Sequence, residues 1–129
     1  MWKTEIQKVV EKLAGKKLRA ASLNRATDSL CLEFDDGTAQ WFTTDAECCS
    51  SSWIEHLATP DDIGGAELVG VDEIDIRRED DHPDHDCLRV YETRFRTTRG
   101  DIVCEYRNAS NGYYGGSLVP AGPATKAGA

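Results

Sequence analysis

The chain has 129 residues, of which 40% are hydrophobic and 29% charged, and its formal net charge at neutral pH is −8. This composition is typical of a soluble globular protein with one domain, and the sequence has no apolar run near the roughly 18 residues that a membrane-spanning helix needs. The first residues lack the basic-then-apolar order of a secretion signal, so we expect a cytoplasmic protein that does not engage a membrane.

Residues 2–13 have the pattern of an amphipathic helix. Hydrophobic side chains recur at helical spacing, and charged side chains occupy the other side. The run Thr4-Glu5-Ile6-Gln7 matches a capping box at the start, and Gly15 suits the left-handed residue just beyond the end. A helix of only about three turns needs a surface on which to pack.

From Lys17 onward the hydrophobic period changes to two, which indicates strands. A first strand is predicted over residues 18–25. Residues 30–35 and 38–43 then form the two strands of a predicted hairpin around the turn at Asp36-Gly37.

The middle of the chain contains an ambiguous segment, a helical turn and a long strand. Residues 52–57 fit either a short strand or a turn of helix. Thr59 as cap and Pro60 at the first helical position predict a single helical turn over residues 59–65. A strand over residues 67–78 follows, and the shift in phase of its apolar residues between Val69/Val71 and Ile74/Ile76 indicates either a bulge or two partly buried faces.

The rest of the chain is predicted to hold an exposed acidic loop, a hairpin, a short strand and a flexible tail. Their ranges are residues 80–86, 88–97 with 102–108, 117–119, and 120–129. Together these elements predict one α+β domain over residues 1–119, mainly an antiparallel sheet with the N-terminal helix packed on one face.

Acidic residues are concentrated in one stretch. Between residues 67 and 86 nine acids stand against two arginines, a net charge of −7 that leaves −1 for the other 109 residues. The acids are Glu67, Asp72, Glu73, Asp75, Glu79, Asp80, Asp81, Asp84 and Asp86. Such a surface repels nucleic acid and can attract a basic groove on another protein, although a solvated face that maintains solubility is the simpler alternative. We therefore expect no direct binding of nucleic acid.

Five cysteines, an odd number, occur in a chain without an export signal. They are Cys31, Cys48, Cys49, Cys87 and Cys104. Adjacent cysteines do not easily bond to each other without straining the intervening peptide, so reduced thiols are favoured over a disulfide framework. Cys31 and Cys104 lie within predicted strands, where a thiol behaves as a small buried hydrophobe.

Histidines and cysteines suggest a zinc site or a thiol catalyst. The candidate residues are Cys48, Cys49, His56, His82, His85 and Cys87. The spacing His82-x2-His85-x-Cys87 resembles half of a structural zinc site, but the other half is a vicinal pair, so an exposed polar loop is favoured. A catalytic Cys49 needs a histidine base such as His56 or His85 nearby, which sequence order does not establish. We therefore favour a protein without catalytic residues, metal or cofactor.

The most distinctive motifs are Cys48-Cys49 leading into Trp53-Ile54-Glu55, and the later run Ser110-Asn111-Gly112-Tyr113-Tyr114. Together with the Asp36-Gly37 hairpin, Ile63-Gly64 and Thr97-Thr98-Arg99-Gly100, they resemble the uncharacterised family of small phage and bacterial proteins catalogued as DUF7448. The resemblance covers much of the middle and C-terminal chain. It implies a phage or prophage origin, and it brings no known activity and no catalytic residues.

Large amphipathic side chains in these motifs are candidates for a contact surface. They are Trp53, Glu55, Tyr113 and Tyr114. Aromatic residues form binding hot spots, but they also fill small cores, so a buried Trp53 that anchors the core is the alternative. We expect the two motif loops to meet on one side of the sheet, as a contact surface or a shallow pocket.

These observations predict a non-enzymatic phage or prophage accessory protein that binds another protein through its acidic surface. The charged contacts are Asp80, Asp81, Asp84 and Asp86. An inhibitor of a host nucleic-acid-binding or defence protein fits this description. Two alternatives stay open: a small thiol- or zinc-dependent enzyme or zinc-stabilised module centred on Cys48, Cys49 and His56, and a structural or assembly protein of a phage particle. The sequence indicates no oligomeric state.

Overall fold

The computed structural model describes residues 3–46, 51–79, 87–110, 116–121 and 125–126. These residues form one helix and nine strands, which confirms the predicted α+β class. The elements are α1 (Glu5–Leu13), β1 (Leu18–Asn24), β2 (Ser29–Phe34), β3 (Thr38–Ala46), β4 (Ser51–Ala58), β5 (Leu68–Glu79), β6 (Cys87–Thr97), β7 (Gly100–Ser110), β8 (Gly116–Pro120) and β9 (Thr125–Lys126). In the described part of the chain, no helix has the length and apolar character needed to cross a membrane.

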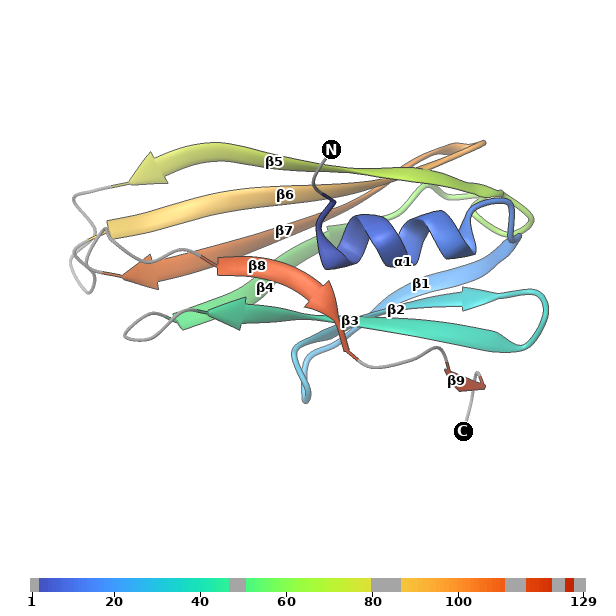
Figure 1. Cartoon of the computed structure of the whole chain (residues 1–129), viewed down its shortest axis with the longest axis horizontal. Coiled ribbons are helices and arrows are strands. Elements are labelled where there is room, and N and C mark those ends of the chain that lie inside the picture. Colours follow the sequence, from blue (N-terminus) through green and yellow to red (C-terminus); the bar gives the residue numbers. More distant parts are fainter. Residues whose placement is uncertain (1–2, 47–50, 80–86, 111–115, 122–124, 127–129) are drawn as a thin grey trace.

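The strands form two antiparallel sheets rather than the single sheet that was predicted (Figure 1). The first has the order β1-β2-β3-β8, with β9 also paired to β3, and the second has the order β4-β7-β6-β5. The prediction of one sheet was wrong because alternation shows which side of a strand is buried, but not which strand lies beside it.

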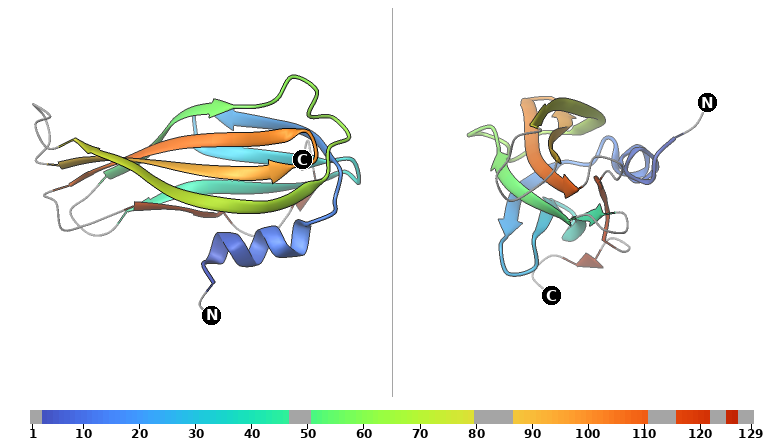
Figure 2. Two further views of the ribbon diagram at one scale, coloured as in Figure 1. Left: turned by 90° about the horizontal axis from the view of Figure 1, so that it is seen from above. Right: turned by 90° about the vertical axis from the view of Figure 1, so that its left-hand side faces the viewer.

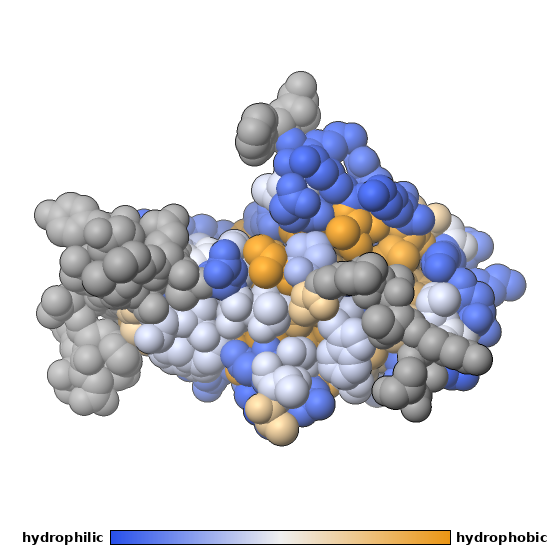
Figure 3. Space-filling view, turned by 60° about the horizontal axis from the view of Figure 1, so that its bottom comes forward, coloured by the Kyte–Doolittle hydropathy of each residue, from blue (hydrophilic) through white to orange (hydrophobic). Residues whose placement is uncertain are grey.

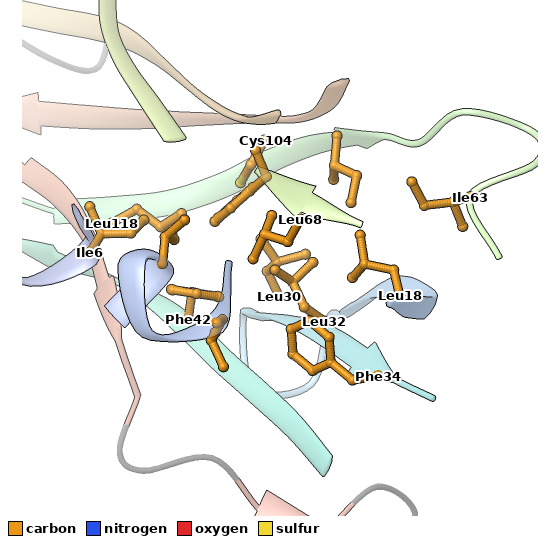
Figure 4. Close-up of a cluster of buried hydrophobic side chains, with 14 of the residues drawn as sticks. Ile6, Leu18, Leu30, Leu32, Phe34, Phe42, Ile63, Leu68, Cys104 and Leu118 are labelled. Atoms are coloured by element: carbon orange, nitrogen blue, oxygen red, sulfur yellow. The ribbon is translucent and has the colours of Figure 1, made fainter. Parts of the chain in front are cut away.

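The two sheets enclose one hydrophobic core. Phe42 of β3 and Phe95 of β6 are fully buried, and their ring centroids lie 5.1 Å apart across the core. Leucines of the first sheet and Cys104 of the second contribute to the same cluster (Figure 4). At one end the sheets are also tied by backbone bonds, because Leu18 N–H donates to the Ala66 carbonyl at 2.7 Å.

Helix α1 covers the open side between the sheets, where it contacts the edge strands β5 and β8 (Figures 1 and 2). Ile6, Val10 and Leu13 are buried, and the Thr4–Gln7 capping box is present as predicted. In the space-filling view, hydrophilic residues cover the outward side of the helix (Figure 3). The helix therefore spans two sheet edges instead of packing on one face, because the second sheet leaves a gap that its apolar stripe fills.

Most predicted strands and both hairpins are confirmed. The ambiguous residues 52–57 belong to strand β4. Strand β5 has register shifts at Leu68/Gly70 and Asp75/Arg77, whereas its pairing with β6 is regular between Val71 and Ile74, where the phase of the apolar residues changes. Strand pairing continues past the predicted domain end at residue 119, since Pro120 pairs with Phe42.

The helical turn predicted over residues 59–65 is wrong. These residues form two turns, at Asp61–Asp62 and at Gly64–Gly65. Gly65 N–H donates to the Leu18 carbonyl at 2.7 Å, which holds this segment against the start of β1. The local signals of Thr59 and Pro60 are overridden by this long-range pairing.

Candidate interaction surface at one end of the sandwich

Six strand ends lie together at one end of the molecule, which we call the motif end (left-hand side of Figure 1). They are Ala46, Ser51, Glu79, Cys87, Ser110 and Gly116. Strand register brings them together, because Cys87 pairs with Ser110, Ser51 with Ala109, and Ala46 with Gly116. The described residues that flank segments 47–50, 80–86 and 111–115 therefore all lie at the motif end.

The two sheets approach each other closely at the motif end. A side-chain carbon on Gly116 of β8 would lie 2.2 Å from Ser52 Oγ of β4 and 3.0 Å from Asn108 Nδ2 of β7. Thr44 Oγ1 of β3 donates to the Ser52 carbonyl at 3.2 Å. Glycine fits best at position 116, because a larger residue would require either Ser52 to rotate away or strand β8 to shift from the second sheet.

Asn108 is the buried polar residue of this contact. It has no exposed surface, and its Nδ2 donates to Ser52 Oγ at 2.9 Å. The described residues offer no hydrogen-bond partner to its Oδ1. Sequence reasoning did not single out Ser52 or Asn108. Their only signal was their place beside the two motifs.

Trp53 and Glu55 lie on the outer side of β4 and form a connected cluster with β7. Trp53 Nε1 donates to Glu55 Oε2 at 2.9 Å, and Arg107 Nη1 lies 3.1 Å from Glu55 Oε1. Arg107 is also within 3.7 Å of the Glu105 carboxylate. Trp53 is partly exposed and lies outside the cluster of buried hydrophobic core residues.

The backbone beneath this cluster is held by the turn between β1 and β2. Glu55 occupies the register shift of β4, between Ile54 and His56. Arg25 donates to the carbonyls of Ile54 and Glu55 at 2.8 and 2.9 Å, and the Asp28 carboxylate accepts from Ile54 N–H at 3.0 Å. These bonds fix the directions of the Trp53 and Glu55 side chains, which lowers the entropy that a partner would have to remove on binding.

Several predicted site residues lie outside the described residues. They are Cys48, Cys49, Asp80, Asp81, His82, Asp84, His85, Asp86, Tyr113 and Tyr114, and of Cys87 only the backbone is described, at the start of β6. The predicted meeting of the two motif loops and the zinc and thiol hypotheses therefore stay predictions.

Among the fully described candidates, His56 is exposed and pairs in register with Glu105. The described part of the chain holds no group of three or more His, Cys, Asp or Glu that could bind a metal. Cys31 and Cys104 are buried, as predicted, and burial raises the pKa of their thiols to about 11 and about 12. A thiol with so high a pKa is protonated at neutral pH and is a poor nucleophile.

The acids of β5 are partly compensated by the neighbouring strand. Asp72 pairs with Arg96 of β6 at 3.0 Å, and Asp75 lies 3.7 Å from Arg89. The count of charges along the sequence missed these pairs, because they depend on the register between β5 and β6. Excess negative charge on β5 is therefore smaller than its own sequence indicates.

A second polar cluster lies where the start of α1 meets β5 and β7. Thr4 Oγ1 donates to Glu73 Oε2 at 3.3 Å, and the rings of Tyr91 and Tyr106 are stacked with centroids 5.1 Å apart. Burial raises the pKa of Glu73, against the effect of this hydrogen bond. Burial first, and the negative charge of Glu73 second, raise the pKa of Tyr106 from 10 to about 12, and a hydrogen bond with the backbone of Leu118 opposes the shift.

The shifted pKa of Tyr106 predicts a loss of stability at alkaline pH. The folded protein holds the phenol proton more tightly than the unfolded chain, so the stabilisation is complete below pH 10 and is lost as the pH rises toward 12. Between about pH 9 and about pH 11.5, wild type should lose about 2 kcal/mol more unfolding free energy than Tyr106→Phe, which lacks this proton. Urea unfolding of both proteins at the two pH values measures the difference. Equal losses would show that Tyr106 titrates normally.

Comparison with known proteins identifies the family. A family model described as "Domain of unknown function (DUF7448)" matches residues 7–119. Neither the curated proteins nor the solved structures include a match to the chain. The matched range begins within α1, ends within β8 and contains all six strand ends of the motif end. The chain therefore belongs to the DUF7448 family.

Proposed function

We propose that this protein is a non-enzymatic accessory protein of phage or prophage origin, which acts in the host-cell cytosol by binding another protein at the motif end. The pairing of strand ends carries the proposal. It brings the residues that flank the acidic segment 80–86 to the same end of the sandwich as the residues that flank segments 47–50 and 111–115. Binding residues are often held on connecting segments at one end of a rigid sandwich.

The chemistry of the acidic segment indicates the partner. Residues 80–86 contain Asp80, Asp81, Asp84 and Asp86 and no basic residue other than two histidines. This charge is complementary to a basic groove, such as one that binds nucleic acid. A host nucleic-acid-binding or defence protein would be inhibited if the aspartates occupied the groove in place of phosphates.

The Trp53–Glu55–Arg107 cluster on β4 and β7 would supply contacts of a different kind. Trp53 is partly exposed and is held by its bond to Glu55, as an aromatic hot spot requires. Electrostatic attraction would speed the encounter, and the aromatic contact would slow dissociation.

Charge reversal should test this proposal. Wild-type protein is used as bait in infected or lysogenic cells, the captured protein is identified by mass spectrometry, and its affinity is measured with purified proteins. Replacing Asp80, Asp81, Asp84 and Asp86 with lysine should weaken binding by about tenfold or more, which corresponds to about 1.4 kcal/mol.

A matched control changes the same number of charges at the opposite end of the sandwich. Asp35, Asp61, Asp62 and Asp101 are all exposed and lie in or beside the turns at that end. Their replacement with lysine should leave the affinity close to that of wild type. Equal weakening by both sets would mean that only net charge matters, and unchanged binding by the motif-end variant would refute the role of the acidic segment.

A further inference from the structure

A cleft of about 400 Å³ lies between helix α1 and the first residues of strand β5. The helix and the strand are in contact along one side of the second sheet (Figure 2). In and beside the helix, residues three or four apart share the face that borders the cleft, namely Lys3, Gln7, Val10, Glu11 and Ala14. The opposite wall is formed by residues 69–71 and Arg96. The volume is within the range of about 300–1,000 Å³ that is usual for sites of small molecules.

The walls of the cleft are largely aliphatic. Val10 is buried, Val71 is partly buried and Val69 is 51% exposed. Val69 is the extra residue of the register shift between Leu68 and Gly70, because it has no partner on β6. Such bulges often lie beside functional sites, where they redirect a side chain. An aliphatic ligand in the cleft would remove apolar surface of Val69 from water.

Gly70 allows one cationic group to reach this cleft. A side-chain carbon at position 70 would clash with Arg96 Nη2 and would lie 3.0 Å from Cζ, so the guanidinium lies directly over the glycine. Arg96 Nε is 3.0 Å from Asp72 Oδ2. Because this ion pair uses Nε, the terminal nitrogens Nη1 and Nη2 can donate two parallel hydrogen bonds to a carboxylate.

The other charges at the cleft compensate each other. Lys3 Nζ lies 2.5 Å from Glu11 Oε1, so these two residues contribute no net charge. Of the described residues that line the cleft, Arg96 then supplies the remaining charge, which is positive on a protein with a formal net charge of −8. The cleft therefore combines aliphatic walls with one positive charge, which is complementary to an aliphatic anion.

We propose that this cleft binds a small aliphatic carboxylate, whose chain lies against the three valines and whose carboxylate binds Arg96. A polypeptide strand fits less well, because the backbone of Leu68 on this side is already bonded. Gly15 N–H donates to the Leu68 carbonyl at 2.8 Å, and Leu68 N–H donates to the Lys16 carbonyl at 3.0 Å. Recognition rests on side chains rather than on addition of a strand. The site is separate from the motif end and does not depend on the proposed function.

The first test uses octanoate as the probe and nuclear magnetic resonance of the isotope-labelled full chain as the readout. Octanoate added to about 10 mM at neutral pH should shift the amide resonances of Gln7, Val10, Gly70 and Val71, with a dissociation constant of about 1 mM or below. 1-Octanol and octylammonium keep the chain but lack the anion, so they should bind at least about fivefold more weakly. Equal binding of 1-octanol would refute recognition of the carboxylate. No shifts, or shifts confined to residues outside the cleft, would overturn the site.

Substitutions test the role assigned to Arg96. Arg96→Gln should weaken octanoate binding at least about fivefold and leave the binding of 1-octanol unchanged. Asp72→Asn removes the competing carboxylate, so it should bind octanoate at least as tightly as wild type. Arg94→Gln is the matched control, because Arg94 pairs with Glu92 at 2.8 Å on the same strand and is not among the described residues that line the cleft. Equal weakening by the two arginine variants would mean that only net charge matters, which would refute the site.

Gly70→Ala tests the position of the guanidinium while it keeps every charge. The added methyl group would displace Arg96, so octanoate should bind more weakly than to wild type. Combined with Arg96→Gln, the same alanine should have little additional effect, because the group that it displaces is already absent. Thermal unfolding of each variant serves as the folding control. A folded Gly70→Ala variant that binds octanoate like wild type would show that the carboxylate does not bind over Gly70.

Discussion

Replacing Phe42 with alanine is expected to lower the free energy of unfolding by about 3–5 kcal/mol, the largest effect of any single substitution considered for this chain. Phe42 has no exposed surface, and its ring meets that of Phe95 from the other sheet at 5.1 Å. Truncation removes apolar contacts and leaves a cavity between two sheets that each depend on the other for burial. For a domain of this size, such a loss is a large part of the total stability.

Urea unfolding followed by circular dichroism measures this effect. Phe95→Ala should cost a similar amount, and a double-mutant cycle should give a coupling of about 0.5–1.5 kcal/mol between the two rings. Ile74→Ala is the control, because Ile74 is 38% exposed and its truncation should change stability by only about 0.5 kcal/mol. A cost near that of Ile74→Ala at position 42 would mean that the two sheets do not share the core described here.

Replacing Gly116 with alanine is expected to destabilise the protein by about 1–3 kcal/mol, although alanine is the smallest possible change. The new methyl carbon would lie 2.2 Å from Ser52 Oγ and 3.0 Å from Asn108 Nδ2. If Ser52 rotates away, it loses its hydrogen bond with Asn108, which is buried. If it stays, β8 must move away from β4, so either response is costly.

A compensating substitution distinguishes this steric cause from a general intolerance of Gly116 variants. Ser52→Gly removes the clashing atom, so the Ser52→Gly, Gly116→Ala double variant should be less destabilised than the sum of the single variants. Gly64→Ala is the matched control. A side-chain carbon at position 64 would lie 3.8 Å from the Arg19 carbonyl oxygen, which is an ordinary van der Waals separation. Additive costs in the double variant would show that the contact with Ser52 is not the cause. In the Gly116→Ala variant, backbone amide hydrogen exchange should become faster than in wild type first at the paired ends of β3 and β8.

Local elements were predictable where short-range signals agree with long-range packing. The capping box of Thr4 and Gln7, the turn at Asp36-Gly37 and the alternation in β6 and β7 specify structure through neighbours in sequence. The turn at residues 59–65 shows the opposite case. There Thr59 and Pro60 favour a helix, but backbone bonds between Gly65, Ala66 and Leu18 are stronger constraints.

The candidate surface was predictable only in its residue types. Trp53 and Glu55 were identified from their motif, but the bond between them depends on the register shift of β4, and their link to Arg107 depends on the pairing of β4 with β7. Asn108 and Ser52 gave no signal other than their place beside the two motifs, because an asparagine or serine in a strand is not informative until its partner across the sheets is known.

The sequence by itself determined the helix, the hairpins and the concentration of negative charge in one stretch, because periodicity, turn chemistry and composition act over a few residues. Tertiary structure decided how the strands divide into two sheets, why α1 lies over the gap between β5 and β8, and which arginines compensate the acids of β5. It also brought together the strand ends that flank the three motif segments. These features depend on strand pairing between residues far apart in the chain, and the hydrophobic pattern of a strand does not specify which other strand pairs with it.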